Sequence, residues 1–270
     1  MTRYQTAVLD NGLRIIALPT ASPVVYCGYQ LNAGTANELP GEEGIAHFCE
    51  HVTFKGTTRR TAIDVIQCLE EVGGDLNAFT TKTDTVYYSA ILKDHLPRAI
   101  DLLTDIVFHS IYPQKEINKE VEVICDEIES YNDSPAELIY DEFENIIFRG
   151  HPLGHSILGT AERVRKFTTE DALRFTQKHY QPMNSVFFAY GDVDFDNLIS
   201  LLEKENHSKV RIKGETEKPI ETPLPALSEY QPQTVKIDKH THQANVMIGN
   251  RAYSIHDKRR MALYLLNNIL

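Results

Sequence analysis

The segment His47-Phe48-Cys49-Glu50-His51 contains the residue types best able to carry out chemistry in this chain. On an α-helix of about 100° per residue, His51 lies about 40° and Glu50 about 300° from His47, so the three side chains share one face. Two imidazoles four residues apart can bind one metal ion, and a carboxylate beside the second can reach a water molecule at that ion. This order is the inverse of the commoner HExxH arrangement.

The opposite side of the same predicted helix is apolar. Four residues lie between about 100° and 200° on the same wheel, namely Ile45, Phe48, Cys49 and Val52. A core-facing side opposite a polar side favours a functional site. The five residues taken alone leave a solvated helix face as the alternative, and a third ligand elsewhere in the chain would decide against it.

A third ligand is available on a helix predicted over residues 114–131. Its apolar stripe is Ile117, Val121, Ile124 and Ile128. Glu116, Glu120 and Glu127 lie together on one flank of that stripe. Neighbouring carboxylates repel one another unless a cation or base neutralises them, so this flank is a candidate metal-binding surface. The spacing does not choose among the three acids.

Apolar periodicity and turn signals predict the elements that must position these side chains. Strands are expected as a hairpin over residues 4–18 around Asp10-Asn11-Gly12, then at 23–32, 75–81, 83–93 and 185–191. Helices are expected at 42–54, 61–72, 96–110, 114–131, 134–148, from the cap at Thr168 onward, and at 195–204. The expected fold is α+β, a two-layer domain with a mostly antiparallel sheet covered by helices.

The sequence predicts three segments. Residues 1–205 form the N-terminal catalytic domain, and residues 206–232, rich in charge, threonine and proline, form a linker. Residues 233–270 begin a second, similar domain, with strands at 234–238 and 245–249 and a helix from Asp257. That helix is still amphipathic at Leu270, so we expect the chain to be a fragment of a longer protein.

The composition of the chain argues against several classes of function. The chain has 270 residues, 42% of them hydrophobic, and a formal net charge of −11. This charge argues against nucleic acid or an anionic membrane as partner, because phosphate binding needs a cationic face. No apolar run reaches the roughly 18 residues of a membrane span, no signal peptide is visible, and the four cysteines lack CxxC spacing. These features predict a cytoplasmic protein with reduced cysteines.

HFCEH together with EVEVICDEIESYNDSP resembles the zinc-binding signature of the pitrilysin/insulysin-type, inverted-motif metallopeptidases. That family includes the mitochondrial processing peptidase and smaller bacterial homologues. The resemblance implies one Zn²⁺ per catalytic domain, with His47, His51 and Glu127 as ligands and Glu50 as the general base. It also implies that Glu120 is a supporting catalytic acid that orients a ligand.

A second segment, GGDLNAFTT, resembles the edge strand of the same family. There Asn77, Ala78 and Phe79 would pair with the backbone of an extended peptide substrate. The implied activity is that of a zinc-dependent endopeptidase acting on short or unfolded peptides, in which Glu50 activates a zinc-bound water.

Family members have two similar halves that close on the substrate, and the second half supplies an Arg and a Tyr to the reaction. The resemblance therefore implies a second homologous half as partner, in the same chain or in a partner chain of a homo- or heterodimer. We expect the 270-residue chain by itself to bind metal but to have little or no peptidase activity. Two alternatives are a non-catalytic partner or scaffold subunit of the same fold, and a metal-binding regulator without proteolysis.

Overall fold

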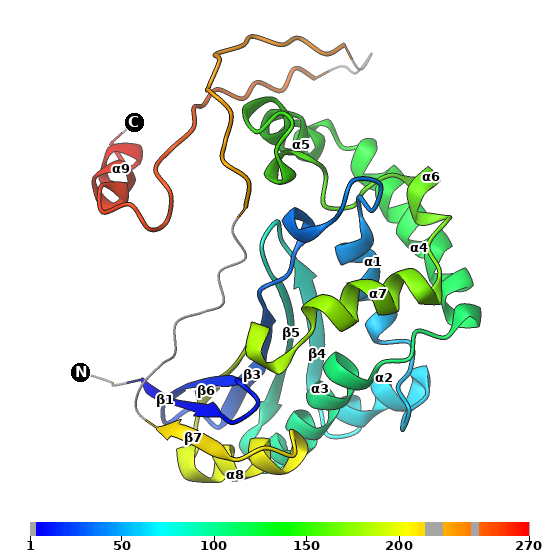
Figure 1. The fold of residues 1–270 in the computed structure, drawn as a ribbon, viewed down its shortest axis with the longest axis vertical. Helices are drawn as coiled ribbons and strands as arrows, with labels where there is room; N and C mark the ends of the chain where they lie inside the picture. The colour runs from blue at the N-terminus through cyan, green and yellow to red at the C-terminus, as the bar shows by residue number, and fades with distance from the viewer. Residues whose placement is uncertain (1–3, 214–223, 239–242, 270) are drawn as a thin grey trace. The chain divides into compact units, whose positions relative to one another are not determined.

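The computed structural model of the protein describes residues 4–213, 224–238 and 243–269. The chain forms two compact units (Figure 1). The first consists of Met1–Glu129 and Ser156–Leu224, and the second of Ser130–His155 and Pro225–Leu270. The first unit is a seven-stranded sheet with helices, so the expected α+β class is confirmed.

The sheet has the strand order β4-β5-β3-β6-β2-β1-β7. The strands are β1 (Gln5–Leu9), β2 (Arg14–Pro19), β3 (Val24–Leu31), β4 (Asp75–Thr80), β5 (Thr85–Leu92), β6 (Ser185–Gly191) and β7 (Val210–Lys213). Among the described pairs only β2 and β6 run parallel, and the others are antiparallel as predicted. The strand β4 therefore lies at one edge of the sheet.

All the predicted helices are present, together with one that was not predicted. They are α1 (Ile45–Thr53), α2 (Ala62–Glu70), α3 (Leu96–His109), α4 (Gln114–Asn132), α5 (Pro135–Ile147), α6 (Ala161–Val164), α7 (Thr169–His179), α8 (Phe195–Glu205) and α9 (Arg260–Asn267). Short 3₁₀ turns lie at η1 (Thr35–Asn37), η2 (Lys93–His95), η3 (Pro152–Gly154) and η4 (Pro182–Asn184). Only the four-residue α6 was not predicted, because one turn has no periodic signal.

Two predictions about the C-terminal third were wrong. Strand β7 lies inside the expected linker and pairs antiparallel with β1, so the sheet extends into that segment. Conversely, the strands expected at 234–238 and 245–249 are not formed among the described residues. A segment with a strand-like sequence pattern forms a β-strand only when a neighbouring strand is available to pair with it. Residues 214–223 and 239–242 lie outside the described residues, and the domain boundaries at 205 and 232 stay a prediction.

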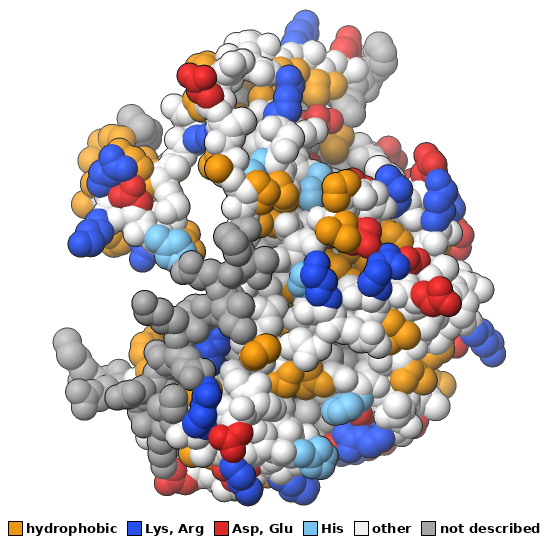
Figure 2. All heavy atoms as spheres, in the orientation of Figure 1, with side chains coloured by type: hydrophobic (Ala, Val, Ile, Leu, Met, Phe, Trp, Pro, Cys, Tyr) orange, Lys and Arg blue, Asp and Glu red, His pale blue; other side chains and the backbone are white. Residues whose placement is uncertain are grey.

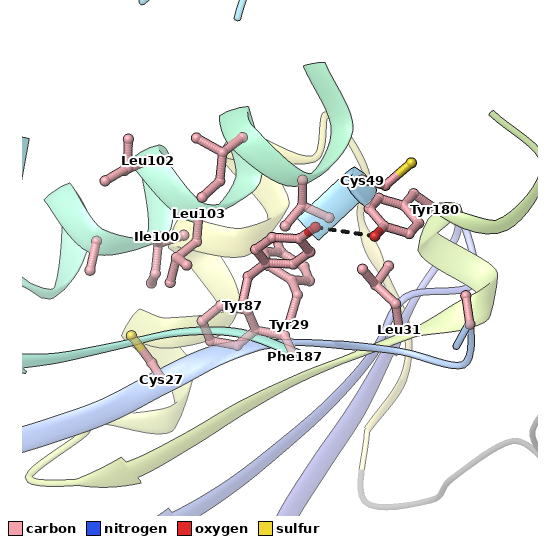
Figure 3. Packing of buried hydrophobic residues seen from close by; sticks show 14 of the residues in the cluster. Cys27, Tyr29, Leu31, Cys49, Tyr87, Ile100, Leu102, Leu103, Tyr180 and Phe187 are labelled. Carbon is pink, nitrogen blue, oxygen red and sulfur yellow. Dashed lines mark hydrogen bonds between the residues drawn. The ribbon is translucent and has the colours of Figure 1, made fainter. Parts of the chain in front are cut away.

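The core lies between the sheet and the helices that cover one of its faces, with α3 packed across β3 and β5. Figure 3 shows this packing around Tyr29, Tyr87 and Phe187. The Tyr29 ring meets the Phe187 ring edge to face, with centroids 4.9 Å apart. The buried hydroxyls are paired: Tyr29 Oη with Thr104 Oγ1 at 2.8 Å, and Tyr87 Oη with Tyr180 Oη at 3.1 Å. Pairing avoids the free-energy cost of burying a lone hydroxyl.

The second unit is held together at the C-terminal end of α5. The Arg251 guanidinium donates two hydrogen bonds to the Ile147 carbonyl, at 2.9 and 2.6 Å, and lies over the Phe148 ring. A cation there satisfies a helix-terminal carbonyl. His151 Nε2 lies 2.8 Å from the Pro225 carbonyl oxygen. The segment after the expected linker is therefore attached to α5 within this unit.

Charges of both signs are interspersed on the face of the protein drawn in Figure 2. In the part of the chain that the structure describes, every helix is too short or too polar to cross a membrane.

The loop after α1 is tied to α3 by a fully buried carboxylate, Asp105. This carboxylate accepts hydrogen bonds from Thr57 Oγ1 at 2.8 Å, Arg59 Nε at 3.0 Å and Arg60 Nη1 at 2.5 Å. Asp101, one turn earlier, pairs with both arginines. Buried charges with several partners are costly to disrupt, because removing one member leaves the others without compensation.

We predict that Asp105→Asn lowers the free energy of unfolding by about 2 to 3 kcal/mol. Glu71→Gln is the matched control, since it removes a solvent-exposed pair with Arg98 and should cost less than about 1 kcal/mol. Urea unfolding of the two variants followed by circular dichroism measures both values. Equal losses for the two variants would show that the buried carboxylate does not hold this loop.

Candidate metal centre

The N-terminal end of helix α1 is fixed by contacts with residues that lie outside the helix. Gly44, which precedes the helix, has φ 95°, a left-handed conformation, and an added Cβ there would lie 2.8 Å from the Leu158 carbonyl oxygen. The buried Glu38 carboxylate accepts hydrogen bonds from the backbone N–H groups of Gly44 at 3.1 Å and Ala46 at 2.9 Å. A negative group is stabilising at the N-terminal end of a helix.

The polar and apolar faces predicted for α1 are confirmed. Its apolar residues are fully buried in the core, namely Ile45, Phe48, Cys49 and Val52. The rings of His47 and His51 lie side by side on the other face, with centroids 4.6 Å apart and planes at 69°. His47 is buried and His51 is half-buried. Core packing of one face thus sets the direction of both imidazoles.

Helix α4 brings two carboxylates to these rings. Glu120 Oε1 lies 3.0 Å from His51 Nδ1, and Glu127 Oε2 lies 3.3 Å from His51 Nε2 and 3.7 Å from His47 Nε2. Glu116, the third acid of the predicted flank, forms an ion pair with Lys119 at 2.9 Å. The tertiary structure therefore distinguishes three residues that the spacing left equivalent.

The donor atoms of His47, His51 and Glu127 all lie within 4.8 Å of one another. A zinc ion with bonds of about 2 Å holds its ligand atoms roughly 3 to 4 Å apart, so small side-chain movements suffice. The contact of Nδ1 with Glu120 directs His51 Nε2 toward Glu127. His47 Nδ1 is buried without a hydrogen-bond partner among the described residues, whereas Nε2 of the same ring faces the cluster. Two imidazoles and a carboxylate fit zinc.

The charges of the cluster favour a cation. Burial opposes a positive charge on His51, but the contacts with Glu120 and Glu127 outweigh it and raise the pKa of His51 to about 9. Burial and the neighbouring His51 lower the pKa of His47. The hydrogen bond with His51 lowers the pKa of Glu127. Two carboxylates are thus held ionised, and protonated His51 supplies the positive charge that compensates them. A divalent ion that displaces the proton of His51 Nε2 would supply that positive charge instead.

Glu50 lies beside this cluster in a different environment. Burial raises the pKa of Glu50, and a hydrogen bond from Thr80 partly opposes the increase. The Thr80 hydroxyl donates to Glu50 Oε2 at 2.5 Å. Thr80 was not among the site residues predicted from the sequence. The alternation of β4 places Thr80 on the same side as Ala78, but only the packing of α1 against β4 shows what that side faces.

Lys55 is a second residue of the site that was not predicted from the sequence. Its ammonium lies 2.6 Å from Glu120 Oε2, and the two side chains are 24% and 11% exposed. The ammonium and His51 together lower the pKa of Glu120 against the opposing effect of burial. The sequence held only a weak signal, because Lys55 follows His51 by four residues but lies in the turn after α1, which ends at Thr53.

The residues expected to bind a peptide lie on β4. Asn77 and Phe79 are exposed, and Ala78 is half-buried. Because β4 is the terminal strand of the described sheet, one of its backbone edges has no strand partner in that sheet. An open edge can accept an extended chain as an additional strand.

Comparison with known proteins assigns the family. Residues 15–161 match the family described as "Insulinase (Peptidase family M16)". The chain belongs to the insulinase family of peptidases. Residues 166–270 match the domain described as "Peptidase M16 inactive domain". The resemblance to pitrilysin/insulysin-type peptidases is therefore confirmed.

Several relatives carry the name zinc protease. One from Rickettsia bellii is 38% identical over 203 residues, which are 74% of this chain and 49% of the relative. The protein YmxG of Bacillus subtilis is 32% identical over 266 residues, which are 97% of this chain and 62% of the relative. The chain thus spans about half to two thirds of the length of these relatives.

Solved structures share the fold. A protease from Helicobacter pylori matches with a TM-score of 0.74 and 25% identity, covering 83% of this chain and 55% of the other. The first half of the periplasmic protease PqqL from Escherichia coli matches with a TM-score of 0.70 and 26% identity, covering 80% of this chain and 48% of the other.

We predict that Glu127→Gln weakens zinc binding by more than about 100-fold, beyond the usual effect of residues that only support a ligand. Glu116→Gln, on the same helix, should leave the affinity unchanged because Glu116 pairs with Lys119. Competition with a chromophoric chelator measures both affinities. Equal affinities for the two variants would place the metal elsewhere.

We predict that Glu120→Gln weakens zinc binding by about 10-fold, because the amide holds His51 Nδ1 less strongly than the carboxylate does. The same competition assay measures this change, with Glu116→Gln again as the control. A loss as large as that of Glu127→Gln would instead make Glu120 a ligand.

Proposed function

We propose that the protein is a zinc-dependent endopeptidase that hydrolyses peptide bonds of short or unfolded peptides. One observation carries the proposal: α1 and α4 bring together His47, His51 and Glu127, while Glu50 on the same face of α1 contacts Thr80 and stays outside that group. The names of the relatives, which describe zinc proteases, support the same chemistry.

In this proposal His47, His51 and Glu127 hold the zinc ion. Zinc, when bound, polarises the peptide carbonyl and lowers the pKa of water. Glu50 takes a proton from the attacking water and returns it to the leaving amine. A half-buried carboxylate with a raised pKa is suited to both steps, because it is a stronger base than an exposed glutamate and still releases its proton. Glu120 keeps His51 oriented through Nδ1.

The substrate would bind as an additional strand at β4. Asn77, Ala78 and Phe79 would offer their backbone groups to an extended peptide. Pairing of this kind recognises the peptide backbone and tolerates many side chains. It requires a segment without secondary structure of its own, which is why we propose short or unfolded peptides.

The active protein would also need a second homologous half, from the same polypeptide or from a partner chain. The match of residues 166–270 to the inactive domain and the greater length of the relatives support this. We propose residues 1–205 together with β7 as the catalytic domain, the part of residues 206–232 that follows β7 as the linker, and residues 233–270 as the beginning of the second domain. Weak activity of the 270-residue chain alone, assembly as a dimer and a cytoplasmic location stay predictions.

The alternative is a non-catalytic partner or scaffold subunit of the same fold. Such a subunit has no need for a general base beside the metal ligands. Glu50 interacts electrostatically with His51 and Glu127, two of the three donors, and its place beside them therefore favours the enzyme.

We predict that Glu50→Gln in the full-length protein lowers peptide cleavage by about 10²- to 10⁴-fold, because the amide cannot accept the proton. Zinc content should be unchanged, since Glu50 is outside the group of donors. Cleavage of a fluorogenic peptide, with and without chelator, and metal analysis measure the two quantities. Glu70→Gln, an exposed glutamate of α2, is the control. Full turnover by Glu50→Gln would refute the assignment of the base.

A further inference from the structure

The hydrogen bond between Thr80 and Glu50 joins two parts of the proposed site that are 30 residues apart in the chain. Thr80 is the last residue of β4, the strand that would bind the peptide, and Glu50 is on α1. A threonine hydroxyl has one proton to donate. Here that proton is committed to Glu50 Oε2, at 2.5 Å. Oε1 of Glu50 does not receive this hydrogen bond and is available to accept a proton from water.

The position of Thr80 is fixed by the turn between β4 and β5. Thr80 pairs with Thr85 in the strand register. The Thr81 N–H donates to the Asp84 carbonyl at 2.7 Å, and the Asp84 N–H donates to Thr81 Oγ1 at 2.9 Å. A turn closed by both backbone and side-chain hydrogen bonds holds the end of β4 in one conformation.

The same turn is attached to the loop that leads into α1. The Thr35 N–H donates to the Thr81 carbonyl at 3.2 Å, and the Ala36 N–H donates to the Lys82 carbonyl at 2.7 Å. The approach requires glycine at position 34, because a Cβ on Gly34 would lie 2.4 Å from the Thr81 carbonyl oxygen. The end of β4 and the approach to α1 are therefore connected by backbone hydrogen bonds.

Glu50 needs an external restraint. The terminal torsion of a glutamate side chain has broad, shallow minima, so its carboxylate does not hold one orientation by itself. A general base acts only when one of its oxygens lies within hydrogen-bonding distance of the proton that it removes. The Thr80 hydroxyl supplies this restraint through a charge-assisted hydrogen bond, which is stronger than a neutral one.

We propose that Thr80 is a positioning residue that couples the peptide-binding edge of β4 to the general base. By holding Oε2, the Thr80 hydroxyl presents Oε1 of Glu50 to the water that is deprotonated. A peptide paired along β4 then lies on the same strand that orients the base, so docking and base orientation share one rigid element. The inference rests on the proposed peptidase function.

Thr80→Val and Thr80→Ser in the full-length protein form a matched pair, because valine keeps the shape without the hydroxyl and serine keeps the hydroxyl. We expect Thr80→Val to lower kcat about 10- to 100-fold, a part of the contribution of a general base. KM and zinc content should be unchanged, and Thr80→Ser should stay within about 3-fold of the parent. Thr83→Val, which removes an exposed hydroxyl from the same turn, is the control and should not change kcat.

A second measurement does not depend on cleavage. Crystal structures of the metal-free full-length protein should show one orientation of the Glu50 carboxylate in the parent and a different or divided orientation in Thr80→Val. An unchanged orientation in Thr80→Val would overturn the proposal. So would an unchanged kcat, a Thr80→Ser variant as impaired as Thr80→Val, or a matching loss of zinc. If the parent itself cleaves no peptide, the proposed function fails, and the crystallographic comparison still decides whether Thr80 holds Glu50.

Discussion

The site depends on the contact of His51 with two carboxylates of α4. Glu120 approaches one nitrogen of the ring and Glu127 approaches the other, at 3.0 and 3.3 Å. Partly buried carboxylates and an imidazole are stable together only when opposite charges or hydrogen bonds compensate them. The two helices can meet this condition because each buries an apolar stripe in the same core. Apolar packing and the charged contacts of His51 thus hold the same two helices, α1 and α4, together.

The glutamates of the site differ in pKa because their surroundings differ, and the difference suits them to different roles. The hydrogen bond with His51 lowers the pKa of Glu127, whereas burial raises the pKa of Glu50. The first carboxylate stays ionised, as a metal ligand must, and the second has a greater affinity for a proton, as a base requires. The contacts of Glu120 with His51 and Lys55 keep Glu120 ionised, so that it can orient His51.

The sheet contributes a rigid core and also an open edge at which a peptide could bind. Its central strands bury aromatic side chains such as Tyr29 and Phe187, whereas β4 is its terminal strand and can offer backbone groups. Because Thr80 contacts Glu50, this open edge is also a structural support of the site. Functional groups held by strands and helices keep their geometry better than groups on free loops.

Features that arise from local periodicity and capping could be predicted from the amino-acid sequence. It predicted the polar face of α1, the hairpin of β1 and β2, and the start of α7, where Thr168 and Asp171 form a capping box. Each of these features depends on residues that are close together in the chain, so the residue types of a short segment are enough to predict it.

Features that depend on residues distant in the chain could be identified only in the folded protein. Glu116, Glu120 and Glu127 share a flank of α4, and only the packing of α4 beside α1 places the last two against His51. The contact of Thr80 with Glu50 and the pairing of β7 with β1 likewise required the assembled fold. The strands expected at 234–238 and 245–249 failed for the same physical reason, because periodicity shows which face a segment can bury but not which partner it meets.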